Sequence, residues 1–181
     1  MKTPSPISNR EFITKLLEST PFKEKGIKTK YRGYSLLVTM PCWNEEGKVG
    51  PGVKSVPRDL VDCICVVNNG SIDNTGIEAE DAGALVISHP VNLGAGGGIR
   101  TGLEYGRINN YDLLAVLAGD NQDDPNDLYR AVDKIIDENV DYVQGSRWLA
   151  DGKRENMTLS RTILTWVYSL LFRVLFRKRI T

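Results

Sequence analysis

An acidic cluster between positions 120 and 127 contains residue types that bind a divalent cation. Asp120, Asp123, Asp124 and Asp127 supply carboxylates there, and Gln122 supplies an amide oxygen. Such hard oxygen ligands suit Mg²⁺ or Mn²⁺, and the ion can bridge a diphosphate and neutralise a leaving group. Residues 124–127 also fit the start of a following helix, and for Asp127 this capping role is favoured. Asp120 is therefore the first candidate for a metal site.

Two other polar segments offer groups that bind nucleotides. Residues 68–75 (NNGSIDNT) follow an apolar run, and Asn68, Asn69 and Ser71 have the oxygens and amide protons to contact a base or ribose. The same residue types also build tight turns, so this segment alone leaves both interpretations open. Residues 92–100 (NLGAGGGIR) are glycine-rich and open a predicted helix, as phosphate-binding loops do. This segment follows the third predicted strand rather than the first, which disfavours a Rossmann dehydrogenase.

The elements that must position these residues alternate between strands and helices. Apolar runs predict strands at 35–40, 63–67, 84–88, 113–117 and, briefly, 142–143, and helical patterns predict helices at 75–82, 97–107 and 126–138. Residues 47–57 contain three glycines and Pro51, so no regular helix is predicted there. The alternation predicts an α/β fold with a mostly parallel central sheet and flanking helices. Ligands bind beyond the carboxyl ends of such strands, so the polar segments 41–46, 68–75 and 118–125 are expected to converge.

Composition narrows the class of protein. The formal net charge of the 181 residues is zero, so no overall field favours nucleic acid, and no nucleic-acid partner is expected. Cys63 and Cys65 lie two apart in an apolar run and should share one face of a strand as buried thiols. His89 is the only histidine and stands apart from the cysteines, so a zinc site is rejected. Residues 1–10 lack the pattern of a signal peptide, so the chain is expected to begin in the cytosol.

Five ordered motifs between Ser35 and Trp148 resemble the family 2 glycosyltransferases of the GT-A (Rossmann-like) fold. Residues 41–46 (PCWNEE) resemble P-A-Y-N-E-E, and residues 68–75 resemble D-D-G-S-x-D-x-T. Residues 92–102 resemble N-x-G-x-G-x-A-I-R-x-G, residues 120–122 resemble the end of D-x-D-x-Q, and residues 145–147 match G-S-R. The pattern is most similar to the dolichyl-phosphate mannosyltransferases and other polyprenyl-phosphate glycosyltransferases.

This resemblance implies transfer of a sugar from a UDP- or GDP-sugar to a polyprenyl or dolichyl phosphate, with inversion and with Mg²⁺ or Mn²⁺. The acceptor phosphate is already a nucleophile and needs little help from a general base. Asp120 and Gln122 are expected to bind the cation, and Asp120 and Arg147 to act in catalysis. The implied donor site consists of Pro41, Trp43, Asn44, Glu45, Asn68, Asn69, Ser71, Gly94, Ala118, Gly119 and Arg147.

Two departures from the family pattern support an alternative. Asn68 and Asn69 replace the paired aspartates, and Ala118 replaces the first aspartate of D-x-D, although residues 118–125 follow the A-G-D-x-Q-x-D-P of some relatives. The alternative is a non-catalytic nucleotide-sugar-binding or regulatory module of the same fold. A nucleotidyltransferase is disfavoured because no glycine-rich phosphate loop follows the first predicted strand.

The chain is expected to have three parts. Residues 1–33 are predicted to form a short helix with a capping box at Ser8 and Glu11, followed by a linker, and residues 34–150 to form the donor-binding domain. Residues 151–181 are apolar but interrupted by arginines, and no uncharged stretch reaches the ~20 residues of a membrane-spanning helix. A basic amphipathic helix at the cytoplasmic face of a membrane is expected there, with a helix packed on the sheet as the alternative. Chains of the resembled family continue past this point, so the sequence is expected to be a fragment.

Overall fold

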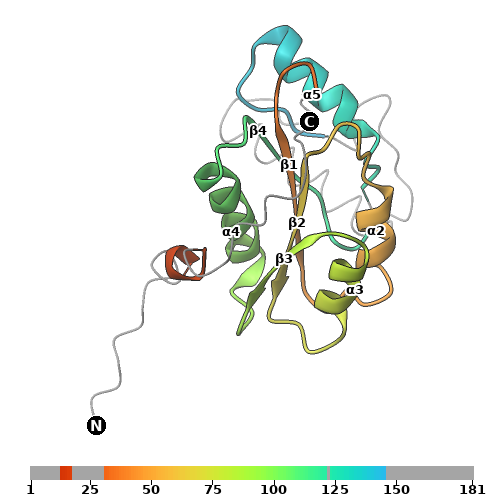
Figure 1. Ribbon diagram of the computed structural model, residues 1–181, viewed down its shortest axis with the longest axis vertical. Coiled ribbons are helices and arrows are strands. Elements are labelled where there is room, and N and C mark those ends of the chain that lie inside the picture. The colour runs from red at the N-terminus through yellow and green to blue at the C-terminus, as the bar shows by residue number, and fades with distance from the viewer. Residues whose placement is uncertain (1–12, 18–30, 122, 146–181) are drawn as a thin grey trace, which may run out of the picture. The chain divides into compact units, whose positions relative to one another are not determined.

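The computed structural model describes residues 13–17, 31–121 and 123–145 (Figure 1). The chain divides into two compact units, Met1–Tyr129 and Arg130–Thr181. The strands are β1 (Leu36–Cys42), β2 (Cys63–Asn69), β3 (Leu85–His89) and β4 (Leu113–Val116). The helices are α2 (Val49–Ser55), α3 (Thr75–Asp81), α4 (Gly94–Ile108) and α5 (Asp127–Glu138), and residues 13–17 are also helical.

The described strands form one parallel sheet with the order β3-β2-β1-β4. In its register, Thr39 of β1 lies between Cys65 of β2 and Val116 of β4. The predicted α/β class, with a parallel sheet and flanking helices, is confirmed. Cys63 and Cys65 share one face of β2, as the sequence indicated. Cys65 is fully buried as expected, whereas Cys63, at the start of the strand, is only partly buried.

Helices cover both faces of the sheet. Figure 1 shows α4 on one side of the sheet and α2 and α3 on the other. The segment 13–17 packs on the α4 side, where Ile13 and Leu17 join Leu37, Val67 and Tyr105 in a buried cluster. This face of the sheet therefore carries one of the apolar clusters of the core.

A row of glycines allows α4 to lie close against β1. Gly98, Gly102 and Gly106 are spaced four apart, so they occupy one face of the helix. A Cβ on Gly98 would lie 2.9 Å from Pro41 Cβ, and one on Gly106 would lie 2.8 Å from Leu37 Cδ2. Each glycine lowers helix propensity by about 1 kcal/mol relative to alanine, so close packing must compensate for that cost.

Two sequence predictions differ from the structure. Residues 47–57 contain helix α2, although no helix was expected there. Pro51 is the third residue of α2, so it lies in the first turn, where its missing N–H breaks no helical hydrogen bond. Tyr142 and Val143 form no strand and have no regular secondary structure, because two residues offer too few ladder hydrogen bonds to persist alone.

The second unit contributes most of α5 to the described residues. Lys134 and Glu138 form an exposed ion pair of 3.2 Å one turn apart on that helix. The predicted amphipathic helix at 151–181 and most of the predicted N-terminal helix lie outside the described residues. Within the described part of the chain, none of the helices has the length and apolar character to span a bilayer.

Candidate functional site

The loops that follow the four described strands meet at one edge of the sheet. All four strands are parallel, so their carboxyl ends point the same way. The polar segments singled out in the sequence follow β1, β2 and β4, and the glycine-rich segment follows β3. The predicted convergence of the polar segments is therefore confirmed.

Hydrogen bonds connect the loop after β1 with the loop after β2. Asn44 N–H donates to Ser71 Oγ at 3.0 Å, and Ile72 N–H donates to Asn44 Oδ1 at 3.0 Å. Glu45 N–H donates to Thr75 Oγ1 at 2.8 Å. Asn44 has a positive φ of 55°, a conformation that asparagine tolerates better than most residues. Asn44 and Ser71 thus orient each other within the predicted donor site.

Acidic side chains form further hydrogen bonds between the residues that precede α2 and the segment that follows β2. Glu46 N–H donates to Asp73 Oδ2 at 3.2 Å, and Asn74 Nδ2 donates to Glu46 Oε1 at 2.7 Å. Gly47 N–H donates to Glu78 Oε2 at 2.6 Å. Burial raises the pKa of Asp73, but the hydrogen bonds that its carboxylate accepts outweigh this effect, and its pKa is lowered. The two loops therefore hold one another through side-chain acceptors and backbone donors.

The loop after β4 passes directly over the end of β1. A Cβ on Gly119 would lie within 3.0 Å of Cys42 Sγ and 3.2 Å from the Pro41 carbonyl oxygen, so only glycine fits without a shift. The pKa of the buried Cys42 thiol is raised to about 12, first by burial and then by the negative charges of Glu45 and Asp120. Both carboxylates therefore act at the end of β1, although they belong to different loops.

Lys48 is the cation that these two carboxylates influence. Its Nζ lies 2.8 Å from Glu45 Oε2, and its pKa is raised first by that hydrogen bond and also by the charge of Asp120. Lys48 is largely exposed, so its pair with Glu45 contributes little to stability. The raised pKa of Lys48 therefore reflects mainly Glu45, with a smaller contribution from the negative charge of Asp120.

The remaining aspartates of the acidic cluster shape their own loop. Ala118 N–H donates to Asp123 Oδ2 at 2.9 Å, and Asn126 N–H donates to Asp124 Oδ1 at 3.0 Å just before α5 begins at Asp127. The helix-start interpretation of residues 124–127 is therefore confirmed. Among the described residues, no three His, Cys, Asp or Glu side chains are grouped closely enough to hold a metal ion. Mg²⁺ commonly uses only one or two carboxylates together with substrate phosphates, so a single carboxylate such as Asp120 is compatible with such an ion.

Asn68 and Asn69 point to opposite faces of the sheet. Both belong to β2, in which successive side chains alternate. Asn68 Oδ1 accepts from Ser71 N–H at 3.1 Å and belongs to the predicted donor site. Asn69 is buried on the α4 side, where its Oδ1 accepts from Leu93 N–H at 3.0 Å and its Nδ2 donates to the Gly94 carbonyl at 3.0 Å. The two side chains were expected to act together on the base or ribose, and the structure separates them.

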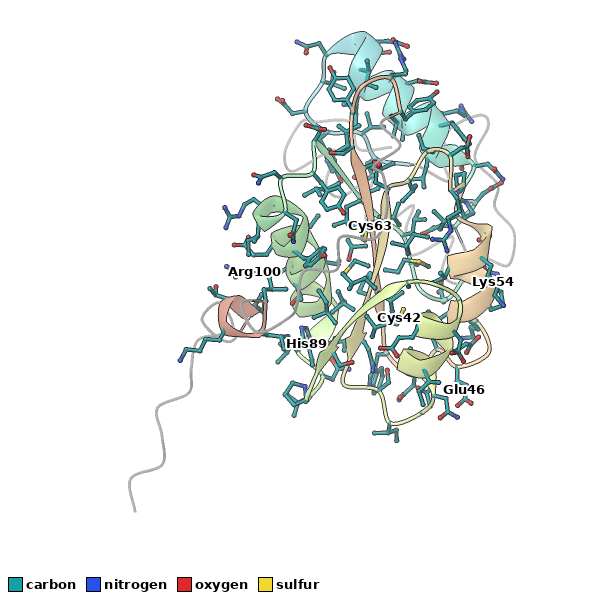
Figure 2. All side chains as sticks on the ribbon, viewed as in Figure 1. Cys42, Glu46, Lys54, Cys63, His89 and Arg100 are labelled. Atoms are coloured by element: carbon teal, nitrogen blue, oxygen red, sulfur yellow. The ribbon has the colours of Figure 1, made fainter. Side chains whose placement is uncertain are left out.

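His89, which is labelled in Figure 2, joins Asn69 in a buried polar network that the sequence did not reveal. Its Nδ1 lies 2.8 Å from Asn69 Oδ1, and its Nε2 lies 2.9 Å from Thr101 Oγ1. The ring is only 4% exposed, and burial lowers its pKa. The one signal in the sequence was the isolation of this histidine at the end of an apolar strand.

Exposed apolar side chains lie at the same edge. Trp43, Ile72 and Val91 follow β1, β2 and β3, and their side chains are 55%, 95% and 59% exposed. An exposed indole next to Asn44 offers a flat surface on which a base can stack. Of the predicted site residues, Gln122 and Arg147 lie outside the described residues.

Comparison with known proteins identifies the family of the chain. Residues 37–180 match the family model described as Glycosyl transferase family 2. An uncharacterized protein of Methanocaldococcus jannaschii is 30% identical over 128 residues, which are 71% of this chain and 53% of that protein. An undecaprenyl-phosphate mannosyltransferase of Micrococcus luteus is 29% identical over 81% of this chain and 62% of its own length. A UDP-N-acetylglucosamine–dolichyl-phosphate N-acetylglucosaminyltransferase of Methanococcus voltae is 27% identical over 71% of this chain and 58% of its own. The chain thus spans between 53% and 62% of these three relatives.

Solved structures share the fold. The glucosyl-3-phosphoglycerate synthase of Mycobacterium tuberculosis, in complex with Mg²⁺ and uridine diphosphate, matches with a TM-score of 0.50 and 24% identity over 68% of this chain and 43% of that one. The mannosyl-3-phosphoglycerate synthase of Rubrobacter xylanophilus matches with a TM-score of 0.50 and 23% identity over 57% of this chain and 36% of that one. The GT-A type of α/β fold expected from the sequence is confirmed.

Proposed function

The chain belongs to glycosyl transferase family 2, and from this membership we propose that it binds the nucleotide-sugar donor for transfer to a polyprenyl phosphate. The observation that carries the proposal is the meeting of Trp43, Asn68 and Asp120 at one edge of the sheet, each from a different strand end. Two of the relatives are named for undecaprenyl-phosphate or dolichyl-phosphate as acceptor, which supports a lipid phosphate here. Such an acceptor also supports peripheral contact with the cytoplasmic face of a membrane.

In this proposal each loop has a separate task. Trp43 stacks on the base, and Asn68 contacts the base or ribose through its amide. The β1 and β2 loops are already hydrogen-bonded to one another, so their side chains are positioned before the donor binds. Pro41, Gly94, Ala118 and Gly119 supply backbone close to the donor, and Arg147 is assigned to the diphosphate.

Asp120, with Gln122, is proposed to hold Mg²⁺ or Mn²⁺. The cation supplies charge neutralisation on the diphosphate that leaves. The pKa of Cys42 is raised first by burial and that of Lys48 first by its hydrogen bond to Glu45, and the negative charges of Glu45 and Asp120 add to both shifts, which supports this role. The acceptor phosphate carries its own negative charge and attacks with inversion, so no described residue is assigned as a general base.

The test is calorimetric titration of UDP and of GDP into the chain, with and without Mn²⁺. One of the two nucleotides should bind, and Mn²⁺ should tighten its binding. Asp120→Asn should remove the Mn²⁺-dependent part, because it removes a charge while preserving size. Asp81→Asn is the matched control, since Asp81 is exposed at the last residue of α3, away from the edge.

Three results would contradict the proposal or one of its parts. If neither nucleotide binds under any condition, the donor site does not exist. If Asp120→Asn leaves the Mn²⁺ dependence intact, the metal role of Asp120 is withdrawn. If Asp81→Asn weakens binding equally, the effect of Asp120→Asn reflects overall charge and not a metal site.

A non-catalytic donor-binding module remains the second candidate. It is favoured by Ala118, which has no side-chain oxygen and whose N–H is bonded to Asp123 at 2.9 Å. Both candidates bind nucleotide, and only the first transfers sugar. Transfer of radiolabelled sugar to a polyprenyl phosphate by a longer form of the chain would decide between them.

A further inference from the structure

The side-chain amide of Asn69 has only one orientation that satisfies its backbone partners. Leu93 N–H can only donate, and it lies 3.0 Å from Asn69 Oδ1. The Gly94 carbonyl can only accept, and it lies 3.0 Å from Asn69 Nδ2. The second Nδ2 proton points to Asn92 Oδ1, also at 3.0 Å. The oxygen of this amide is therefore fixed on the side of Leu93.

This orientation determines which nitrogen of His89 carries a proton. His89 Nδ1 lies 2.8 Å from Asn69 Oδ1, which is an acceptor, so Nδ1 must be protonated. His89 Nε2 lies 2.9 Å from Thr101 Oγ1, and that hydroxyl is also 3.0 Å from the Gly97 carbonyl. Thr101 can donate to a neutral Nε2, or accept from Nε2–H and donate to Gly97 instead. The hydroxyl can therefore bond to either the neutral ring or the imidazolium. Other groups around the ring determine which of the two forms is present.

The surroundings of the ring favour its neutral form. The ring is 4% exposed, and burial disfavours the imidazolium. On the same face of the sheet, the buried titratable groups of β2 and α4 are the Cys65 thiol and the Tyr105 phenol, which burial keeps protonated and uncharged by raising the pKa of each. Cys63 of β2 is partly buried there, and Glu104 of α4 is half-buried and paired with Arg107 at 2.7 Å. Arg100, next to Thr101 on α4, is exposed. Asn69 itself places a neutral amide against the ring, where a carboxylate would favour the imidazolium.

The same amide fixes the turn that opens α4. Its bonds to Asn92, Leu93 and Gly94 reach three successive residues of that turn. Gly70, the residue after Asn69, has a positive φ of 75°, and a Cβ there would lie 2.5 Å from Asn92 N. The turn therefore lies directly against the end of β2.

We propose that Asn69 is a positioning residue, which holds His89 as the neutral Nδ1–H tautomer and, through the same amide, fixes the turn 92–94 at the start of α4. In this assignment Asn69 acts inside the protein and does not contact the donor. The identity of residue 69 then sets the charge of a buried ring, since aspartate at this place would retain the bonds to Leu93 and His89 while adding a negative charge. This assignment goes beyond the proposed sugar transfer and holds whether or not that transfer occurs.

Nuclear magnetic resonance of the full chain, labelled with ¹⁵N in histidine, tests the proposal directly. His89 is the only histidine in the sequence, so a single ring contributes signals. Long-range ¹H–¹⁵N correlations distinguish the Nδ1–H tautomer, the Nε2–H tautomer and the imidazolium. We expect the neutral Nδ1–H tautomer in the wild type near pH 7. The Nε2–H tautomer or an imidazolium at that pH would overturn the proposal.

Two variants extend the test. Asn69→Asp should give at least about tenfold more imidazolium than wild type near pH 7, the ratio expected for one opposite charge at hydrogen-bond distance. Thr101→Val removes the partner of Nε2 and should leave the proton on Nδ1, because Asn69 places it there. An unchanged ring charge in Asn69→Asp, or a changed tautomer in Thr101→Val, would contradict the role of Asn69.

Asn68→Asp is the matched control for charge. It introduces the same charge on the adjacent residue, which points to the other face of the sheet. Its effect on the imidazolium population should be clearly smaller than that of Asn69→Asp, and an equal effect would contradict the proposal. If Asn69→Asp fails to fold, the tautomer in the wild type and in Thr101→Val still decides the question.

Discussion

Replacing Gly119 with alanine should disturb the contact that brings the loop after β4 to the end of β1. The new Cβ would lie within 3.0 Å of Cys42 Sγ, 3.3 Å from Cys42 Cβ and 3.2 Å from the Pro41 carbonyl oxygen. Ordinary carbon–carbon contacts are about 3.5–4.0 Å, so the overlap with Sγ is severe and the other two contacts are tight. Cys42 is 2% exposed and belongs to β1, which is paired on both sides, so it has little room to move.

The expected cost follows from the two opposing effects. Overpacking a well-packed site destabilises by about 1–3 kcal/mol. Alanine has less conformational freedom than glycine in the unfolded chain, and this effect stabilises the folded state by about 0.4–1 kcal/mol. We therefore expect Gly119→Ala to lower the free energy of unfolding by about 1–2 kcal/mol and to weaken Mn²⁺-dependent nucleotide binding, because Asp120 moves with the loop. Urea titration followed by circular dichroism measures the first effect, and calorimetry measures the second.

A double-mutant cycle with Cys42→Ala makes the test specific. Removing Sγ relieves the most severe overlap, so Gly119→Ala should cost less in the Cys42→Ala background than in the wild type. The difference should exceed about 0.5 kcal/mol, the limit within which independent sites usually add. Additive effects would refute the contact between the loop after β4 and the end of β1, which positions Asp120.

Two further predictions concern the helix α4 and the buried ring. Gly102→Ala should destabilise the chain in urea titrations, because its Cβ would lie 2.5 Å from the buried Thr39 Cβ, whereas Gly96→Ala, with open space around it, should stabilise by up to about 1 kcal/mol. Equal effects of the two substitutions would contradict the close packing of α4 on β1. The free energy of unfolding should also decrease as pH falls below 6.5, since burial lowers the pKa of His89 from that value, and the stability present above it is lost as pH falls through the folded pKa. If the free energy of unfolding depends on pH in the same way in the wild type and in His89→Asn between pH ~7 and ~5, the attribution of this dependence to His89 is contradicted.

Local patterns predicted most of the fold. The strands and three of the helices were visible because apolar runs and helical periodicity agree with the tertiary structure. Helix α2 was missed because its glycines and Pro51 have poor helix propensity. The helix forms nevertheless for two reasons. Pro51 lies in its first turn, where a missing N–H is tolerated, and Glu78 accepts the Gly50 N–H at 3.1 Å. Propensity carries no information about a partner 28 residues away in the chain.

The candidate site was predictable to the level of loops, and its finer geometry was not. Parallel strands bring their ends together, so the convergence followed from the alternation of elements alone. The sequence placed the end of the second strand at Val67, whereas β2 continues to Asn69. This two-residue difference matters, because asparagines inside a strand alternate between faces while asparagines in a loop can point together. The network around His89 was hidden for the same reason, since it requires β3 to extend one residue beyond Ser88.

The hydrogen bonds between the loops after β1 and β2 affect the entropy of ligand binding. The backbone donors of residues 44–47 are already held by side chains of residues 71–78, so the loops are ordered when the chain folds. A ligand that enters this edge then loses little affinity to loop ordering, which otherwise costs about 0.5–1.5 kcal/mol for each immobilised flexible side chain. Folding and affinity become linked as a result. Glu46→Ala, which removes the acceptor of two hydrogen bonds from Asn74, should therefore weaken binding by returning conformational freedom to these loops.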